Sequence, residues 1–482
     1  CFKPVSRFFA RVNRPEQLIA ALMGAMRVLT DPAETGAATI ALPQDVQAEA
    51  FDWPAELFDK RVWHIARPPA EPAQLRRAAQ LIRRSTRPLI VAGGGVVYSE
   101  ADAALRAFAA ATGIPVADTQ AAKGAINWDH PQSVGGVGAT GAQAANRLAA
   151  DADVVIGIGT RYSDFTTASR SQFQNPDVAF VNINVAAFDA AKQAGLTLVA
   201  DARTAIEALA VELDGYRVSP DHARRVAAER AAWAEITERC YHLGHGPLPA
   251  QTEVFGALNE LMGPRDVLIN AAGSMPGDLQ ALWRASDSTA YHVEYAFSCM
   301  GYEIPAALGV KLAAPDRQVV AIVGDGAYQM LPMELATIVQ EDAKVIFVLL
   351  QNHGFASIGA LSQSHGSQRF GTKYLKRNPR TGRLDGPPTP VDIAANAASW
   401  GLAVIKAKSV ADFRLAYRQA EAAAGPVMIH IETDLEGPNP PSDSWWDVPV
   451  AAVSSLDSTR RARNEYEVAK AGQRPLISQP PK

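Results

Sequence analysis

Two short polar segments, each directly after an apolar strand-like run, contain the residues best suited to hold a metal ion. One run, 319–323, ends in Gly-Asp-Gly, and a later run, 344–350, ends in Gln-Asn-His-Gly. If these runs are neighbouring parallel strands, both segments lie at the sheet edge where open α/β sheets bind ligands. Asp325 then supplies a carboxylate, Asn352 a side-chain carbonyl and Gly354 a backbone carbonyl. Three oxygen ligands suit Mg²⁺ and leave positions for phosphate oxygens and water.

The spacing of the two segments makes this interpretation more specific than either segment alone. A single Gly-Asp-Gly after a strand is usually only a turn. Here the second segment follows after one expected helix, as two neighbouring parallel strands require. The glycines on both sides of Asp325 allow a phosphate to approach the backbone closely. We also expect a helix that begins after Tyr328 to favour negative charge at its start.

The elements that must position these segments follow an α/β pattern. Apolar strand-like runs alternate with alanine-rich helical patterns, which predicts doubly wound parallel-sheet domains. A chain of 482 residues is also too long for a single core. Five regions are expected: a first block with one helix and one strand (1–66), a central α/β domain (67–215), a connecting helix (216–248), a third α/β domain (249–436) and a proline-rich tail with a short helical stretch (437–482).

Composition excludes several classes of protein. The formal net charge is −4, and no basic run is present, so nucleic-acid binding is not expected. No apolar stretch reaches the roughly 18 residues that a membrane span needs. Three scattered cysteines form neither a disulfide framework nor a zinc site, which favours a reducing, cytoplasmic location. The chain opens at Cys1 without a Met or a targeting pattern, and we interpret it as beginning partway through a domain.

The paired segments resemble the cofactor motif of the thiamine diphosphate enzyme superfamily, a Gly-Asp-Gly followed by an Asn-Asn pair. The resemblance implies thiamine diphosphate and Mg²⁺ as cofactors, with Asp325, Asn352 and Gly354 as metal ligands. Gln351 departs from the family pattern, because it stands where the first Asn is usual, but that Asn is not itself a ligand.

Two further segments fit the same superfamily. Residues 298–307 resemble its apolar-Gly-aromatic segment before a helix, in which Met300 stands where a bulky side chain wedges between the two cofactor rings. Residues 273–275 match its other diphosphate-side loop. The cofactor-binding residues that the resemblance implies are Gly273, Ser274, Met300, Gly324, Asp325, Gly326, Ala327, Asn352 and Gly354.

The superfamily resemblance also assigns roles to the regions. Residues 1–66 would be the C-terminal remnant of the pyrimidine-binding domain, and 249–436 the diphosphate-binding domain. The glutamate that activates the cofactor belongs to the pyrimidine-binding domain, and no residue here matches it, so it is expected upstream of Cys1. Because the cofactor lies between two subunits in this superfamily, a homodimer or homotetramer is implied.

Three stretches, 292–295, 351–372 and 442–460, look very like the trihydroxycyclohexanedione hydrolases of bacterial myo-inositol catabolism. That family opens a polyhydroxylated cyclic diketone at a carbon–carbon bond and forms a 5-deoxy-glucuronic acid, with covalent catalysis by the cofactor. His353 and His365 are the implied acid–base helpers. Polar side chains suited to bind substrate hydroxyls follow the metal segment: Ser357, Ser362, Gln363, Ser364, Ser367, Gln368 and Arg369.

Other functions remain open at this point. An acetolactate synthase-like carboligase shares the fold and the metal motif, although the segment after Asn352 argues against it. A non-catalytic subunit that binds thiamine diphosphate would explain the absence of the activating glutamate. A nucleotide-binding regulator would need a phosphate fingerprint in the central domain, where the glycines at 93–95 and 157–159 do not extend into one.

Overall fold

The chain folds around two six-stranded sheets and one two-stranded sheet in the computed structural model, which describes residues 1–294 and 296–475. All strand pairs recorded between the named strands are parallel. The prediction of doubly wound α/β domains is therefore confirmed. The boundaries expected for the five regions stay a prediction.

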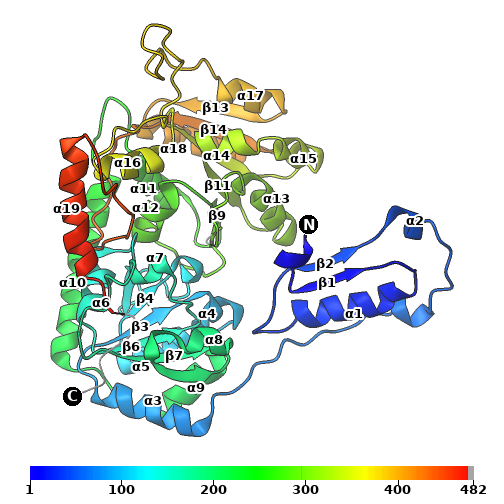
Figure 1. Ribbon diagram of the computed structural model, residues 1–482, viewed down its shortest axis with the longest axis vertical. Helices are drawn as coiled ribbons and strands as arrows, with labels where there is room; N and C mark the ends of the chain where they lie inside the picture. Colours follow the sequence, from blue (N-terminus) through cyan, green and yellow to red (C-terminus); the bar gives the residue numbers. More distant parts are fainter. Residues whose placement is uncertain (295, 476–482) are drawn as a thin grey trace.

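The first 66 residues form a small unit that lies beside the two large sheets (Figure 1). Strand β1 (Phe8–Arg11) pairs with β2 (Ala38–Ala41), and α1 (Gln17–Leu29) packs on them. The prediction of a single strand in this block was wrong. Strand β1 is short, follows Arg7 and ends at Arg11, so its sequence resembles a surface segment. The remaining short helices are η1 (Lys3–Val5), α2 (Gln44–Gln47) and η2 (Ala55–Phe58).

A six-stranded parallel sheet forms the middle of the chain. In spatial order its strands are β5 (Ser133–Gly136), β4 (Val116–Asp118), β3 (Pro88–Ala92), β6 (Val154–Ile158), β7 (Ala179–Asn184) and β8 (Leu196–Val199). Its helices are α3 (Pro72–Arg84), α4 (Gly94–Tyr98), α5 (Asp102–Thr112), η3 (Gln120–Ala122), α6 (Gln143–Asp151), α7 (Asp164–Thr167), α8 (Ala187–Ala190), η4 (Lys192–Ala194) and α9 (Ala202–Glu212).

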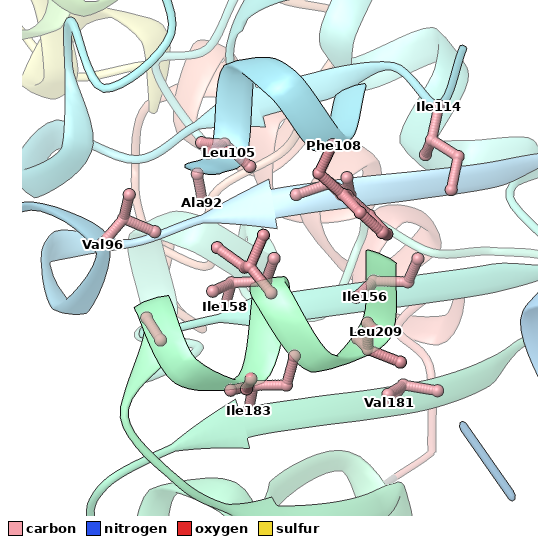
Figure 2. Packing of buried hydrophobic residues seen from close by; sticks show 14 of the residues in the cluster. Ala92, Val96, Leu105, Phe108, Ile114, Ile156, Ile158, Val181, Ile183 and Leu209 are labelled. Atoms are coloured by element: carbon pink, nitrogen blue, oxygen red, sulfur yellow. The ribbon is translucent and has the colours of Figure 1, made fainter. Parts of the chain in front are cut away.

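Both faces of this middle sheet are covered, which is why its central strands are continuous apolar runs. Side chains from α3, α5 and α9 fill one face, and α6 covers part of the other. Figure 2 shows Leu105 and Phe108 packing toward β3, and Leu209 toward β6 and β7. The glycines after β3 and β6 pack against each other, since a Cβ on Gly93 would lie 2.4 Å from the Gly159 carbonyl oxygen. These glycines form tight turns at the ends of the two strands.

The second six-stranded sheet carries the two polar segments. In spatial order its strands are β10 (Tyr291–Val293), β9 (Val267–Asn270), β11 (Val319–Gly324), β12 (Ile346–Gln351), β14 (Val427–Glu432) and β13 (Ala403–Ala407). One face is covered by α11 (Gln251–Leu261), α12 (Met275–Leu282) and α18 (Val410–Ala422). The other is covered by α13 (Glu303–Ala313), α14 (Asp325–Met330), α15 (Glu334–Gln340) and α17 (Ile393–Ser399).

Two long helices join and brace the sheets. The connecting helix α10 (Pro220–Tyr241) packs against α6 and α11. It therefore contacts a helix on each of the two large sheets. After β14 the chain returns to the middle sheet, where the indole Nε1 of Trp446 donates to Asp164. The tail ends in α19 (Asp457–Ala471), which has 15 residues and is longer than the short stretch predicted. Within the described part of the chain, no helix is long and apolar enough to cross a membrane.

Candidate cofactor site

The ends of β11 and β12 bring the two polar segments together. The two strands are parallel neighbours, with Gly324 paired to Leu350, as the sequence predicted. Two details of the prediction were wrong. Two helices, α14 and α15, lie between these strands instead of one, and the first begins at Asp325 and not after Tyr328. Asp325 therefore occupies the first turn of a six-residue helix, and its carboxylate is the negative group at that helix start.

The carboxyl group of Asp325 is buried against the second segment. Its side chain is only 1% exposed, and Oδ2 accepts hydrogen bonds from the amides of Asn352 (3.1 Å) and His353 (2.6 Å). These bonds stabilise the ionised form, but burial outweighs them and raises the pKa of Asp325 to about 6. Because burial disfavours the charge of this carboxylate, a cation bound beside it would stabilise the ionised form.

The turn after Asn352 is tightly constrained. His353 has a φ of +61°, and the Asn352 side-chain oxygen accepts from the amide of Gly354 at 3.2 Å. A Cβ on Gly354 would lie only 2.4 Å from the carbonyl oxygen of Thr372. Gly354 is therefore required for close packing of this turn against the segment that follows α16 (Ala356–Ser364). Two of the three predicted ligand residues thus lie in one rigid turn beside Asp325, the third.

Gln351 organises a chain of hydrogen bonds along the sheet edge that the sequence analysis missed. Its Oε1 accepts from Nε2 of His430 (2.7 Å), and its Nε2 donates to Nδ1 of His353 (3.1 Å). Because Nδ1 of His353 accepts, its proton resides on Nε2, which faces Oε1 of Glu432 at 3.6 Å. Burial lowers the pKa of His430, so it donates as a neutral ring. The departure from the family's Asn pair therefore orients the imidazole of His353.

Met300 lies over the Gly-Asp-Gly segment. A Cβ on Gly326 would lie 3.1 Å from the Met300 Cε and 3.0 Å from the ring of Phe355. The Met300 side chain is 36% exposed, so it is not simply a core residue. Gly324 is also close to a methionine, since a Cβ on Gly324 would lie 3.4 Å from the Cε of Met275. Glycines at 324 and 326 thus allow two methionines and an aromatic ring to lie directly against this segment.

The turn at Gly273 and Ser274 faces open space at the end of β9. Gly273 has a φ of +91°, and a Cβ there would meet no atom within 4 Å. The Ser274 hydroxyl donates to Oε1 of Gln251 (3.0 Å), and the amide of Gln251 donates to the carboxyl of Asp278. Burial raises the pKa of Asp278 to about 7. This short chain of bonds holds the turn, and the sequence analysis did not single out Gln251 or Asp278.

His365 lies apart from this centre. It follows α16 (Ala356–Ser364), whereas His353 precedes that helix, so about 13 Å of helix separates them. Its Nδ1 contacts the carbonyl oxygen of Leu361 at 2.7 Å. The ring lines an open cavity of about 440 Å³ between α16 and residues 448–459, together with Ser362 and Ser367. The structure therefore does not bring the two predicted acid–base histidines together.

Several of the other polar side chains proposed for substrate binding already have partners. Nε of Arg369 donates to Oε1 of Gln363, and Glu436 lies 3.8 Å away. The Ser364 hydroxyl donates to Leu361 within α16. Tyr295, in one of the stretches that suggested the family, lies outside the described residues. Among the residues that the structure describes, no group of three or more His, Cys, Asp or Glu side chains could hold a metal ion.

The metal ligands expected from the sequence at this edge of the sheet are Asp325, Asn352 and the carbonyl of Gly354. That set has one carboxylate, one amide oxygen and one carbonyl, so a hard cation would need phosphate oxygens and water to complete its shell. The open turn at Gly273, where a Cβ would meet no atom within 4 Å, leaves room for a diphosphate group on the same edge of the sheet. The residues present thus fit a cofactor that brings its own oxygen ligands.

Comparisons with known proteins agree with this site. Residues 75–209 match the family description "Thiamine pyrophosphate enzyme, central domain", and residues 271–431 match "Thiamine pyrophosphate enzyme, C-terminal TPP binding domain". The second match contains every cofactor-binding residue predicted from the sequence.

Curated relatives are similar over almost the whole chain. A protein of Bacillus cereus named 3D-(3,5/4)-trihydroxycyclohexane-1,2-dione hydrolase 2 is 42% identical, over 96% of this chain and 75% of its own length. A hydrolase of the same name, without the final numeral, from Clostridium tetani is 41% identical over 96% of this chain and 75% of its own length. The one from Clostridium perfringens is 40% identical over 98% of this chain and 78% of its own length. Together with the site at the ends of β9, β11 and β12, these matches show that the chain belongs to the thiamine pyrophosphate enzyme family.

Proposed function

We propose that this chain carries out, in the cytoplasm, the reaction for which its relatives are named, hydrolytic carbon–carbon cleavage of 3D-trihydroxycyclohexane-1,2-dione to 5-deoxy-glucuronate in inositol catabolism. The observation that carries the proposal is identity of 42% over 96% of the chain. That similarity extends far beyond the cofactor-binding residues that all thiamine diphosphate enzymes need. A shared fold alone would not support a substrate.

Mg²⁺ would be held by Asp325, Asn352 and the carbonyl of Gly354. The support is that Asp325 is buried and lies directly against the Asn352–Gly354 turn, where its Oδ2 accepts from the amides of Asn352 and His353. The Asn352 side-chain oxygen accepts from the amide of Gly354 and has a second lone pair that could bind a metal ion.

Bound thiamine diphosphate supplies a nucleophilic carbon and takes up the electron pair that carbon–carbon cleavage releases. His353 would handle a proton in this reaction. Its Nε2–H is half-exposed and near Glu432, while Gln351 holds the ring from the other side. A neutral imidazole in that state donates Nε2–H as a hydrogen bond to a substrate oxygen, whereas proton transfer would occur from the protonated ring, which becomes neutral as the proton leaves. His365 remains a candidate for binding a substrate hydroxyl, since it lines the cavity beside α16.

The assembly is proposed to be a homodimer or homotetramer, because superfamily members form the cofactor site between subunits. Exposed apolar side chains around the site would be available for such contacts, including Phe297, Met330 and Met333, which are 87%, 55% and 57% exposed. Analytical ultracentrifugation with and without thiamine diphosphate and Mg²⁺ would test this assembly.

The test of function begins with binding. Thiamine diphosphate and Mg²⁺ are titrated calorimetrically into the chain and into an Asp325→Ala variant, and binding should require Mg²⁺ and disappear in the variant. The cyclic dione is then supplied to the full-length protein and release of the acid is measured. Acetolactate formation from pyruvate without dione cleavage would favour a carboligase, and binding without turnover of either substrate would favour a non-catalytic subunit. Either result would contradict the proposed hydrolase activity.

A further inference from the structure

A buried glutamate begins α13, three residues after Met300. Glu303 is 0% exposed, its Oε2 accepts from the amide of Gly301 at 3.0 Å, and its Oε1 has no hydrogen-bond partner among the described residues. The amide of Ala272 also faces the carboxyl group, but no basic side chain among the described residues interacts with it. Burial raises the pKa of Glu303 to about 7.

The carboxyl group of Glu303 lies between two turns of the cofactor site. Ala272 directly precedes the open turn at Gly273, and Gly301 directly follows Met300. Gly301 has a φ of +90°, and a Cβ there would lie 2.8 Å from the Cβ of Leu331, so this second turn packs closely against the chain that follows α14. Glu303 therefore links the end of β9 with the methionine that lies over Gly326.

The position is costly for folding. A carboxyl group taken out of water needs hydrogen bonds to every oxygen or a cationic partner, and Glu303 has neither for Oε1 among the described residues. An apolar side chain of the same length would fill the space without that cost. Residues that lower stability without a structural reason are found mainly where function requires them.

We propose that Glu303 is a positioning residue, whose carboxyl group holds the Ala272–Gly273 turn and the Met300–Gly301 turn at the separation that thiamine diphosphate needs. Because the carboxyl group is fully buried beneath these turns, it acts through them and does not touch the cofactor. The inference rests on cofactor binding by this site and is independent of the substrate.

The test compares Glu303→Met with Glu303→Gln, and uses Glu341→Gln as a matched control on the exposed end of α15. Methionine keeps the length and removes the acceptor, whereas glutamine keeps one acceptor oxygen. The Met variant should unfold at the same urea concentration as the parent chain or higher. Its Kd for thiamine diphosphate with Mg²⁺ should rise about 10- to 100-fold, as for residues that orient a direct ligand. The Kd of the Gln variant should lie between those of the parent and the Met variant, and the Kd of the Glu341→Gln control should equal that of the parent.

A purely structural role gives the opposite pattern, in which the Met variant unfolds earlier and its affinity falls only as folded protein is lost. Parent-like affinity in a stable Met variant would also overturn the proposal. Amide hydrogen exchange measures the contact itself, and exchange at Gly301 and Ala272 should accelerate in the Met variant without a global change. If the exchange rates of Gly301 and Ala272 were unchanged in the Met variant, measured without cofactor, the proposal would be overturned. Failure of the parent chain to bind thiamine diphosphate, with the exchange result as expected, would instead count against the proposed function.

Discussion

Replacing Asp325 by asparagine should change folding stability and cofactor binding in opposite directions. The carboxyl group is 1% exposed and accepts two backbone amides through Oδ2. Asparagine is of the same size, and its carbonyl oxygen can accept both amides. The variant therefore keeps the geometry of the turn at Asn352 and removes only the negative charge.

The magnitude follows from the pKa of Asp325, which burial raises from 3.8 to about 6 in the metal-free protein. At about 1.4 kcal/mol for each pH unit, this difference corresponds to about 3 kcal/mol. The folded state binds the proton more tightly than the unfolded state, so the parent chain loses this stability as the pH rises from about 4 to about 6. Asparagine does not ionise, so above pH 6 the variant should be the more stable by up to about 3 kcal/mol, and below pH 4 the two should be similar.

Urea unfolding in the presence of EDTA, at pH 7.5 and pH 4, measures the stability difference. Calorimetric titration of thiamine diphosphate with Mg²⁺ measures the functional loss, which should exceed about 100-fold, because the residue is proposed as a direct ligand rather than a supporting one. A less stable variant at pH 7.5 would show that the charge contributes to folding through a partner that the geometry does not reveal. Unchanged affinity would remove Asp325 from the metal site.

Three further substitutions test other parts of the site. Met300→Ala should lower the free energy of unfolding by no more than about 1 kcal/mol, since the side chain is 36% exposed. It should nevertheless weaken thiamine diphosphate binding about 10-fold. Urea unfolding measures the first effect and calorimetric titration the second. His353→Asn places at 353 a residue that tolerates the φ of +61°, so the affinity for the cofactor should persist. The kcat for dione cleavage should fall by about 10²- to 10⁴-fold, and a parent-like kcat would exclude His353 as a proton donor. Gly354→Ala places a Cβ 2.4 Å from the Thr372 carbonyl oxygen and should cost about 1–3 kcal/mol in urea unfolding, whereas a fully stable variant would show that the turn can shift.

Much of the fold could be predicted from the sequence because its central strands are continuous apolar runs. Strands β3, β6, β11 and β12 are buried along almost their whole length, and their composition indicates this directly. Shorter strands such as β4 and β10 were missed, because three residues carry no periodic signal. Strand β13, at the edge of its sheet, was missed for a different reason, since its mixed burial resembles a surface segment.

The sequence by itself determined which residues stand at the ends of β11 and β12, because a polar segment that follows a buried parallel strand must emerge at the carboxyl edge of the sheet. Asp325, Asn352 and Gly354 were found in this way. Only the tertiary structure decided which distant groups meet them. Gln351 bonds to His430, 79 positions away, because β12 and β14 are neighbours, and this orients His353. Glu303 meets the amide of Ala272 because α13 begins beside the end of β9. Such contacts depend on strand order and side-chain torsions, and these are set by the packing of the whole sheet, which no local pattern encodes.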